Sequence, residues 1–226
     1  MTYRVTDVGD ACVVIEFEAR VDPALNRRAV AAADRVAGAA LPGVRDVVAT
    51  YHAVAVHFDP LEADRDRLIR ALEQAVRSPD AGARAADAAH EIPVCYGGEY
   101  GPDLPDLARF AGCSEEAVVH LHCDPVYRVY MMGFLPGFAY LGTVDERLRM
   151  GRHETPRLRV PAGSVGIAGF QTGVYPLESP GGWRVIGRTS VKPYDERRAD
   201  PLLFRTGDEV RFVPVTADRF RREAAA

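Results

Sequence analysis

Three residues near the middle of the chain, His120, His122 and Cys123, are of types that bind transition metals. On a strand the two histidines would share a face while the cysteine points away, and on a helix the two histidines diverge by about 200°. Neither arrangement brings three ligands together locally. The sequence therefore favours an ordinary helix end with packing or capping histidines over a metal site.

A nucleophilic serine is a second candidate, because Ser164 lies between Gly163 and Gly166. The G-x-S-x-G turn of serine hydrolases needs a glycine at position 162, where this chain has alanine. The glycine-rich surroundings also predict a turn between strands and not a strand–turn–helix unit. A pairing of Ser164 with His153 has no support from spacing, so covalent catalysis is disfavoured.

A Walker-type phosphate loop is excluded, because its lysine must follow a glycine-rich run and Lys192, the single lysine, does not. Gly163, Gly166 and Gly169 recur every three residues. Their backbone N–H groups could form an anion-binding concavity. Alternatively, the glycines let tight turns approach a neighbouring strand, which is the favoured of the two interpretations.

The densest cluster of unusual residues lies between positions 131 and 190, which hold eleven of the twenty glycines. Rigid turns, aromatic rings and uncharged polar groups alternate there with few carboxylates. Such a surface suits a planar amide-like ligand or a protein partner better than acid–base work by paired acids. The segments concerned are GFLPGFAYL at 133–141, VPAGSVGIAG at 160–169, QTGVYP at 171–176, SPGGW at 179–183 and IGRT at 186–189.

The second part of the chain reads as a compact β-barrel, because glycine and proline at this density exclude long helices. The predicted strands are 91–95, 126–132, 164–167, 183–187 and 209–213. Two short helices are expected before the glycine-rich part, at 104–112 and from Ser114 onward.

The first part predicts a small α/β sandwich with its helices over one face of a sheet. A strand at 11–17 precedes a helix that begins at Asp22–Pro23 and runs to Ala40. Two strands within 44–58 and a helix at 62–77 follow. The fold class is thus α+β, with an N-terminal domain at 1–80, a linker at 81–90 and a barrel domain at 91–226.

Composition limits the function further. The 226 residues are 47% hydrophobic and carry a net charge of −4 with no basic run, which argues against nucleic acid and anionic membranes as partners. No apolar run reaches membrane-spanning or signal-peptide length, so a soluble cytoplasmic protein is expected. The four cysteines are dispersed and are expected to be free thiols.

Taken together, the spaced motifs resemble the C-terminal cyclophilin-like domain of the family of 5-oxoprolinase B subunits. That family is also called allophanate hydrolase subunit 1 and includes an inhibitor of a sporulation histidine kinase. The resemblance is dense from Gly133 to Pro214 and looser over the N-terminal domain. The chain departs from the family at turns and edges, in Gly151–Arg152, Thr189–Ser190 and Pro193–Asp195.

The resemblance implies a fold, partners and a reaction. The chain would act with a homologous cyclophilin-like C subunit and a separate A subunit in the ATP-dependent opening of 5-oxo-L-proline to L-glutamate. ATP would activate the resonance-stabilised lactam by phosphorylating its amide oxygen. Because the chain has no lysine loop, the nucleotide would lie at a shared interface, held by glycine N–H groups and Arg188.

Site roles follow from the same resemblance. Gln171 and Thr172 are expected to orient the amide, with Arg188 as the third catalytic residue. Anion or oxyanion contact is expected from three residues, Gly163, Ser164 and Gly166. The remaining substrate-site residues are expected to wall the site against water: Phe134, Pro136, Phe138 and Trp183.

Two other functions remain open. One is a carboxyltransferase or allophanate-hydrolase component of urea metabolism, which a biotin-bearing partner would favour. The other is a regulator without catalytic activity that docks on a sensor histidine kinase. Binding of the isolated chain to a kinase, with no loss of 5-oxoproline use in a deletion strain, would favour the regulator.

Overall fold

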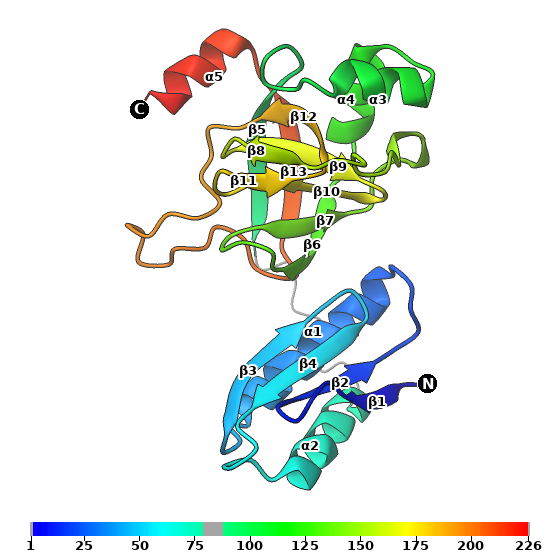
Figure 1. Ribbon diagram of the computed structural model, residues 1–226, viewed down its shortest axis with the longest axis vertical. Helices are drawn as coiled ribbons and strands as arrows, with labels where there is room; N and C mark the ends of the chain where they lie inside the picture. Colours follow the sequence, from blue (N-terminus) through cyan, green and yellow to red (C-terminus); the bar gives the residue numbers. More distant parts are fainter. Residues whose placement is uncertain (1, 79–87, 226) are drawn as a thin grey trace. The chain divides into compact units, whose positions relative to one another are not determined.

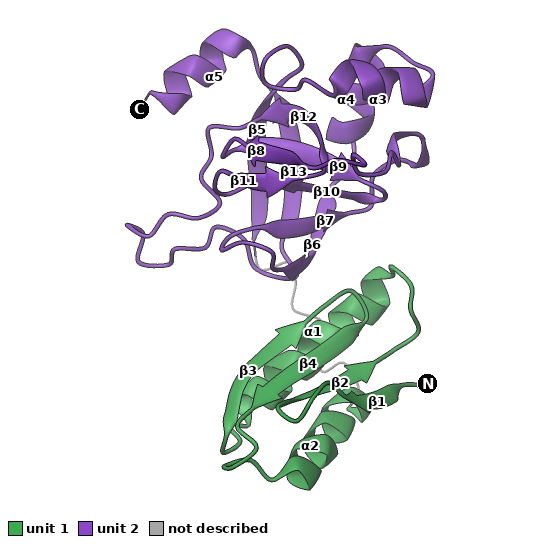
Figure 2. Cartoon of the chain, viewed as in Figure 1, with its two compact units in different colours: residues 1–85 green, residues 86–226 purple. Residues whose placement is uncertain are grey.

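The computed structural model describes residues 2–78 and 88–225. The chain divides into two compact units, residues 1–85 and 86–226, which Figure 2 shows in separate colours. Most of the predicted linker, 81–90, lies outside the described residues. Strand β5 begins at Ala89, so the barrel domain starts at least two residues before the predicted position 91.

The first unit is a four-stranded antiparallel sheet with two helices packed on it (Figure 1). The helices and strands share one buried core, which confirms the predicted α/β sandwich. The strands, in sheet order, are β1 (Arg4–Asp7), β2 (Cys12–Glu16), β4 (Ala53–Phe58) and β3 (Val44–Ala49). The helices are α1 (Pro23–Gly38) and α2 (Arg65–Arg77).

Helix α1 begins where its sequence signals predict. The Asp22 carboxylate accepts hydrogen bonds from two backbone N–H groups of the first turn, at 2.7 and 3.1 Å, and Pro23 occupies the first helical position. The helix ends at Gly38, two residues before the predicted Ala40, whose φ of 43° is not helical.

Helix α2 begins at Arg65 and not at the predicted Glu62. The backbone N–H of Glu62 donates to the carbonyl oxygen of Asp59 at 3.1 Å, in a turn that precedes the helix. Asp64 then caps the helix by accepting from the N–H of Arg67 at 3.0 Å. The apolar residues at helical spacing predicted the helix, but the capping aspartate sets the residue at which it begins.

The second unit is a closed seven-stranded barrel (Figure 1). Its described strand pairs are antiparallel except for β5 and β13, which run parallel. Around the barrel the strands are β10 (Gln171–Val174), β7 (Ala139–Gly142), β6 (Tyr127–Met132), β13 (Glu209–Pro214), β5 (Ala89–Tyr96), β12 (Arg184–Arg188) and β9 (Ser164–Ala168). A separate two-stranded sheet pairs β8 (Arg157–Val160) with β11 (Ser179–Gly181).

Short helices accompany the barrel. The two predicted ones are confirmed within about a residue, and a 3-10 turn and a C-terminal helix are additional. None of the helices in residues 2–78 and 88–225 is long and apolar enough to cross a bilayer. The helices are α3 (Leu104–Ala111), α4 (Glu115–Cys123), η1 (Glu146–Leu148) and α5 (Ala217–Ala224).

Several elements were missed in the sequence. Strands β7, β8, β10 and β11 hold three or four residues each, too few to show a period-2 alternation. Strand β1 is short and mostly exposed, so it lacks an apolar face to detect. Helix α5 has one buried residue, Phe220, and its remaining residues are charged or small. Tertiary contacts, not local pattern, define these elements.

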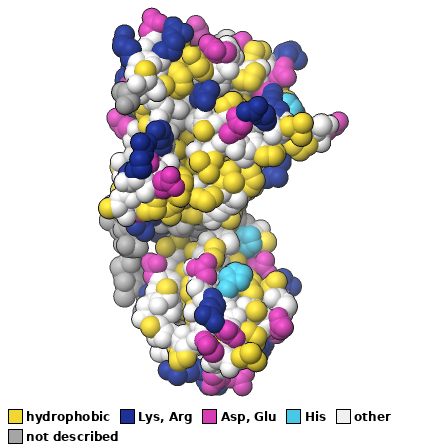
Figure 3. Space-filling model, turned by 60° about the vertical axis from the view of Figure 1, so that its left-hand side comes forward, with side chains coloured by type: hydrophobic (Ala, Val, Ile, Leu, Met, Phe, Trp, Pro, Cys, Tyr) yellow, Lys and Arg dark blue, Asp and Glu magenta, His cyan; other side chains and the backbone are white. Residues whose placement is uncertain are grey.

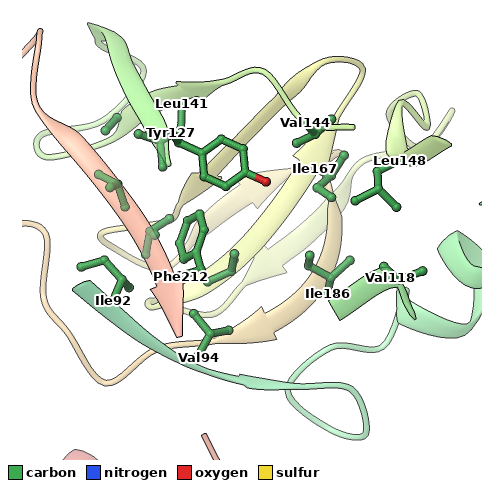
Figure 4. Packing of buried hydrophobic residues seen from close by; sticks show 14 of the residues in the cluster. Ile92, Val94, Val118, Tyr127, Leu141, Val144, Leu148, Ile167, Ile186 and Phe212 are labelled. Carbon is green, nitrogen blue, oxygen red and sulfur yellow. The ribbon is translucent and has the colours of Figure 1, made fainter. Parts of the chain in front are cut away.

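The barrel interior is filled with side chains and forms the main core of the second unit. Figure 4 shows the rings of Tyr127, from β6, and Phe212, from β13, beside one another among aliphatic residues. Their centroids are 5.6 Å apart. Because the interior is packed, a ligand site of this unit has to lie outside the barrel core. Aliphatic neighbours in the same cluster include Val94, Leu141, Ile167 and Ile186.

Candidate functional site

A pocket of about 280 Å³ opens beside the barrel and is lined mainly by aromatic side chains. Its volume lies near the lower end of ligand sites, which span roughly 300–1,000 Å³, so it suits a small molecule. Five aromatic residues form its walls, together with one arginine, two prolines and two glycines. The lining residues are Phe134, Phe138, Tyr140, Arg152, Pro156, Tyr175, Pro180, Gly181, Gly182 and Trp183.

The Phe138 ring is the centre of the aromatic cluster. It is 1% exposed, and its centroid lies 4.9 Å from that of Tyr140, 5.3 Å from Trp183 and 5.5 Å from Tyr175. All three contacts are edge-to-face, a geometry worth about 0.5–1.5 kcal/mol for each pair beyond area burial. The walls are therefore mutually braced and held in one arrangement.

The turn before β7 sets the mouth of the pocket. The N–H of Phe138 donates to the carbonyl oxygen of Leu135 at 3.0 Å, and Gly137 has a φ of 84°, as the third residue of a type II turn requires. Pro136 takes the second position of this turn and is exposed. Phe134 also has a positive φ, 68°, and its side chain is 58% exposed. Backbone strain at an exposed aromatic residue is typical of binding sites.

Tyr175 is fixed from two directions. A Cβ on Gly181 would lie 2.4 Å from the Tyr175 hydroxyl, so only glycine lets β11 pass this close. On the other side, the carbonyl oxygen of Tyr175 accepts from the N–H of Gly163 at 2.7 Å, and its own N–H donates to Ser164 at 2.9 Å. Burial raises the pKa of Tyr175, so its phenol is neutral.

The three residues expected to contact an anion lie behind the pocket walls. The N–H of Gly163 is used by Tyr175, and that of Ser164 donates to Pro161 at 3.2 Å. Gly166 sits inside β9 between two neighbouring strands, and a Cβ there would lie 3.2 Å from the Cβ of Trp183. These residues support Tyr175 and Trp183, and the backbone donors of Gly163 and Ser164 are used within the fold.

The three expected catalytic residues are not brought together with the pocket lining. Thr172 is fully buried, and its hydroxyl donates to the carbonyl oxygen of Gly166 at 3.0 Å. Arg188 donates from Nε to the carbonyl oxygen of Ala162 at 2.9 Å. Gln171 pairs with Gly142 and Ala168 at the start of β10. Their positions are those of residues that hold the barrel and its turns.

His122 and Cys123 belong to a buried hydrogen-bond chain. The Cys123 thiol donates to the Tyr96 hydroxyl at 3.3 Å, and that hydroxyl lies 2.8 Å from Nδ1 of His122. On the other side of the ring, Nε2 lies 2.8 Å from Oγ1 of Thr172. Because the Thr172 proton is given to Gly166, Nε2 carries the imidazole proton and Nδ1 accepts.

This environment keeps His122 neutral. Burial lowers the pKa of His122 to about 3. Among the described residues no three histidine, cysteine or acidic side chains are grouped so as to hold a metal. The His122 ring is fully buried and stacks on Phe212, with their centroids 4.5 Å apart. The contact with Thr172, fifty residues away, left no local signal.

A charged cluster missed in the sequence lies next to the pocket. Asp103 has a side chain only 4% exposed; it accepts from Nη1 and Nη2 of Arg157 at 2.8 and 2.6 Å and from the N–H of Val185 at 2.6 Å. Nε2 of His153 lies 3.2 Å from the same carboxylate. Burial alone would raise the pKa of Asp103, but these hydrogen bonds outweigh it and lower the pKa. His153 is thus committed to this cluster.

Known proteins share both the sequence and the fold. Residues 3–204 match the family described as carboxyltransferase domain, subdomain C and D. The B subunit of 5-oxoprolinase from Bacillus subtilis (strain 168) is 37% identical over 229 residues, which cover 95% of this chain and 93% of that protein. The protein of the same name from Escherichia coli O157:H7 is 43% identical over 213 residues, covering 92% and 94%.

A solved structure agrees with these relatives. The crystal structure of TTHA0988 superposes with a TM-score of 0.81 at 43% identity and covers 91% of this chain. This chain spans 40% of the length of TTHA0988. Because the two 5-oxoprolinase relatives exceed a third in identity over more than nine-tenths of their length, the resemblance noted in the motifs is confirmed. The chain belongs to the family of 5-oxoprolinase B subunits.

Proposed function

We propose that this chain is the B subunit of an ATP-dependent 5-oxoprolinase, which acts with a homologous C subunit and a separate A subunit to open 5-oxo-L-proline to L-glutamate. Family membership supports the reaction. The single structural observation that carries the proposal is the small pocket walled by Phe134, Phe138 and Trp183. Flat aromatic walls accept a flat lactam ring and keep bulk water away from its carbonyl group.

Within the complex, this chain binds 5-oxo-L-proline and orients it. The pocket lining contains no carboxylate, histidine or lysine side chain among the described residues, so it offers no general base. The groups that move protons and activate water are accordingly assigned to the partner subunits. Arg188 and Gln171 act by holding the turns behind the pocket, and Thr172 acts by ordering the barrel interior.

ATP does not fit a cradle built from this chain alone. The backbone donors of Gly163 and Ser164 are used inside the fold, as is that of Gly169, which donates to Met150 at 2.8 Å. Lys192 lacks the glycine-rich loop of a nucleotide site. We therefore assign the nucleotide to another subunit of the complex.

Hydrophobic surface on the second unit supports a partner that covers it. Phe134, Leu158 and Leu177 are 58%, 85% and 39% exposed, and Figure 3 shows a broad area of hydrophobic side chains on one face of this unit. Such surface is typical of a protein interface. The homologous C subunit is the proposed partner. The four cysteines are free thiols, which supports a reducing cytoplasm as the compartment.

The test is coexpression of this chain with the products of its neighbouring genes, followed by an assay for ADP release. We expect release stimulated by 5-oxo-L-proline, and no stimulation by urea. The isolated chain is expected to release no ADP. A response to urea alone contradicts the proposal and favours the carboxyltransferase alternative. Tight binding of the isolated chain to a sensor kinase, with normal 5-oxoproline use in a deletion strain, favours the regulator.

A further inference from the structure

The segment that carries Arg152 is held by hydrogen bonds on both sides. Before it, the carbonyl oxygen of Gly151 accepts from Nε of Arg184 at 3.0 Å. After it, the backbone N–H of His153 donates to the carbonyl oxygen of Gly182 at 2.7 Å. Nη1 of Arg184 also donates to Nδ1 of His153 at 2.8 Å. The backbone of Arg152 is therefore fixed at the edge of the pocket.

The hydrogen bonds that hold the Arg152 segment are in turn supported by a buried charge. His153 contacts the carboxylate of Asp103, which also binds Arg157 with two hydrogen bonds and is nearly excluded from solvent. A buried carboxylate with several charge-assisted hydrogen bonds resists displacement, because each lost bond leaves a desolvated charge. The Asp103 cluster thus serves as a rigid base beneath the Arg152 segment.

The Arg152 side chain is the one charged group of the pocket lining among the described residues. It lines the pocket together with Tyr140 and Tyr175, and its Cβ would lie 3.7 Å from a Cβ added at Gly182, another lining residue. Within residues 2–78 and 88–225 it forms no hydrogen bond or ion pair. Other arginines of this chain pair with acids, as Arg147 does with Asp145. An arginine kept beside a pocket without an acid is available to an anionic ligand.

We infer that the pocket recognises a small ring-bearing carboxylate, with the aromatic walls taking the ring and Arg152 taking the carboxylate. The identification of that carboxylate as 5-oxo-L-proline rests on the proposed function. A guanidinium matches a carboxylate with two parallel N–H···O bonds. Arg152 is then a specificity residue, since it favours 5-oxo-L-proline over the uncharged lactam 2-pyrrolidinone and over urea.

Trp183 provides the measurement, because it is the only tryptophan of the chain and lines the pocket. The full-length chain is titrated with 5-oxo-L-proline and with 2-pyrrolidinone while its tryptophan fluorescence is recorded. We expect a saturable change with both ligands and at least about tenfold tighter binding of 5-oxo-L-proline, as expected for a charge-assisted pair. Equal affinities for the two ligands overturn the inference.

Three variants locate the effect at Arg152. Arg152→Gln is expected to weaken 5-oxo-L-proline binding by about tenfold and to leave 2-pyrrolidinone binding within about twofold. Arg152→Lys keeps the positive charge but loses the paired N–H donors of the guanidinium. Its affinity for 5-oxo-L-proline should therefore lie between those of Arg152→Gln and the natural chain. Arg109→Gln is the matched control, because Arg109 is a 77% exposed arginine of α3 paired with Asp106, away from the pocket lining. It should change nothing.

A second measurement uses the kinetics of the assembled complex, because the pocket could close only when the C subunit covers it. There Arg152→Gln should raise the KM for 5-oxo-L-proline about tenfold with a much smaller change in kcat. An unchanged KM overturns the inference. If carboxylate-selective binding is seen but the complex never turns over 5-oxo-L-proline, the proposed function fails and the inference stands. Absence of both binding and turnover overturns both.

Discussion

Inside the barrel, Nε2 of His122 lies 2.8 Å from Oγ1 of Thr172, although the two residues come from helix α4 and strand β10. The Thr172 hydroxyl in turn donates to the carbonyl oxygen of Gly166, at the strand position that Trp183 packs against. A buried polar chain therefore links the interior of the barrel to one wall of the aromatic pocket. Both its donors and its acceptors are satisfied within the fold.

Thr172→Val removes this link without changing the side-chain shape. The imidazole N–H and the Gly166 carbonyl each lose a buried partner, so we expect a loss of about 1–3 kcal/mol in the free energy of unfolding. Urea denaturation measures the change. Thr172→Ser keeps the hydroxyl and should recover most of the loss. Equal stability of the valine variant and the natural protein would show that the link contributes nothing.

The buried imidazole also makes stability depend on pH. His122 has a pKa of about 3 in the folded chain against an ordinary value of 6.5, so between these values only the unfolded chain binds the proton. Stability from this group is full above pH 6.5 and falls as the pH drops towards 3, by about 1 kcal/mol per pH unit. Urea denaturation at pH 7.5 and 5 measures it.

Two variants separate His122 from the other titrating groups. His122→Gln should reduce the fall in stability between pH 7.5 and 5, whatever its stability at neutral pH. His120→Gln, a change at an exposed histidine of the same helix, should keep the full dependence. If the two variants show the same dependence as the natural chain, His122 is not the group responsible.

Replacing the buried carboxylate of Asp103 should cost far more stability than replacing the exposed carboxylate of Asp106. Asp103→Asn leaves Arg157 facing a neutral amide in a desolvated cluster, and we expect a loss of about 3 kcal/mol. Asp106→Asn, in helix α3, which follows Asp103 directly, breaks a pair with Arg109 in which both side chains are 45% exposed or more. That change should cost about 1 kcal/mol or less. Comparable losses in thermal unfolding would contradict the buried role of Asp103.

The close pass of β11 over Tyr175 predicts a steric effect. Gly181→Ala puts a methyl group 2.4 Å from the hydroxyl of the buried Tyr175, so the ring or the strand must shift. We expect a loss of about 1–3 kcal/mol in stability and a shifted Trp183 emission, since both rings share the pocket. Gly151→Ala is the matched control, because nothing lies within 4 Å of its added Cβ. If Gly181→Ala changes neither the stability nor the Trp183 emission, β11 lies further from the Tyr175 ring than this structure shows.

Arg188 tests whether the turn behind Tyr175 matters for turnover. Its Nε holds the carbonyl oxygen of Ala162, and its side chain lies beside Gly163. Arg188→Ala should leave the fold and assembly with the C subunit intact while lowering turnover of the complex by about tenfold, through a displaced pocket wall. Size-exclusion chromatography checks assembly and ADP release checks turnover. Unchanged turnover in the assembled complex removes Arg188 from the functional residues.

Local sequence accounts for the turn at the mouth of the pocket. The segment from Gly133 to Phe138 encodes its own turn, with Pro136 and Gly137 at the positions that a type II turn demands. That turn orients Phe134 and Phe138, which the family resemblance assigned to the walls of the site. Trp183 was expected for the same reason, and all three line the pocket.

The charged residues could not be predicted in this way. Asp103 meets Arg157 and Val185 across 54 and 82 residues, and no periodicity or motif joins positions that far apart. Conversely, Gly163 and Ser164 stand out in the sequence as anion donors, yet their N–H groups are used by neighbouring backbone. Whether a backbone donor is free depends on the strand beside it, which only the fold specifies.

The sequence by itself determined the α+β architecture, the start of helix α1 at its aspartate cap, three of the five aromatic residues of the pocket and the family. Each of these depends on interactions within about ten residues or on motifs whose spacing is local. Tertiary structure alone decided the short barrel strands, the neutral state of His122 and the placement of Arg152 beside the pocket. These depend on burial and on hydrogen bonds between distant segments, and the free energy of such contacts exists only once the barrel has closed.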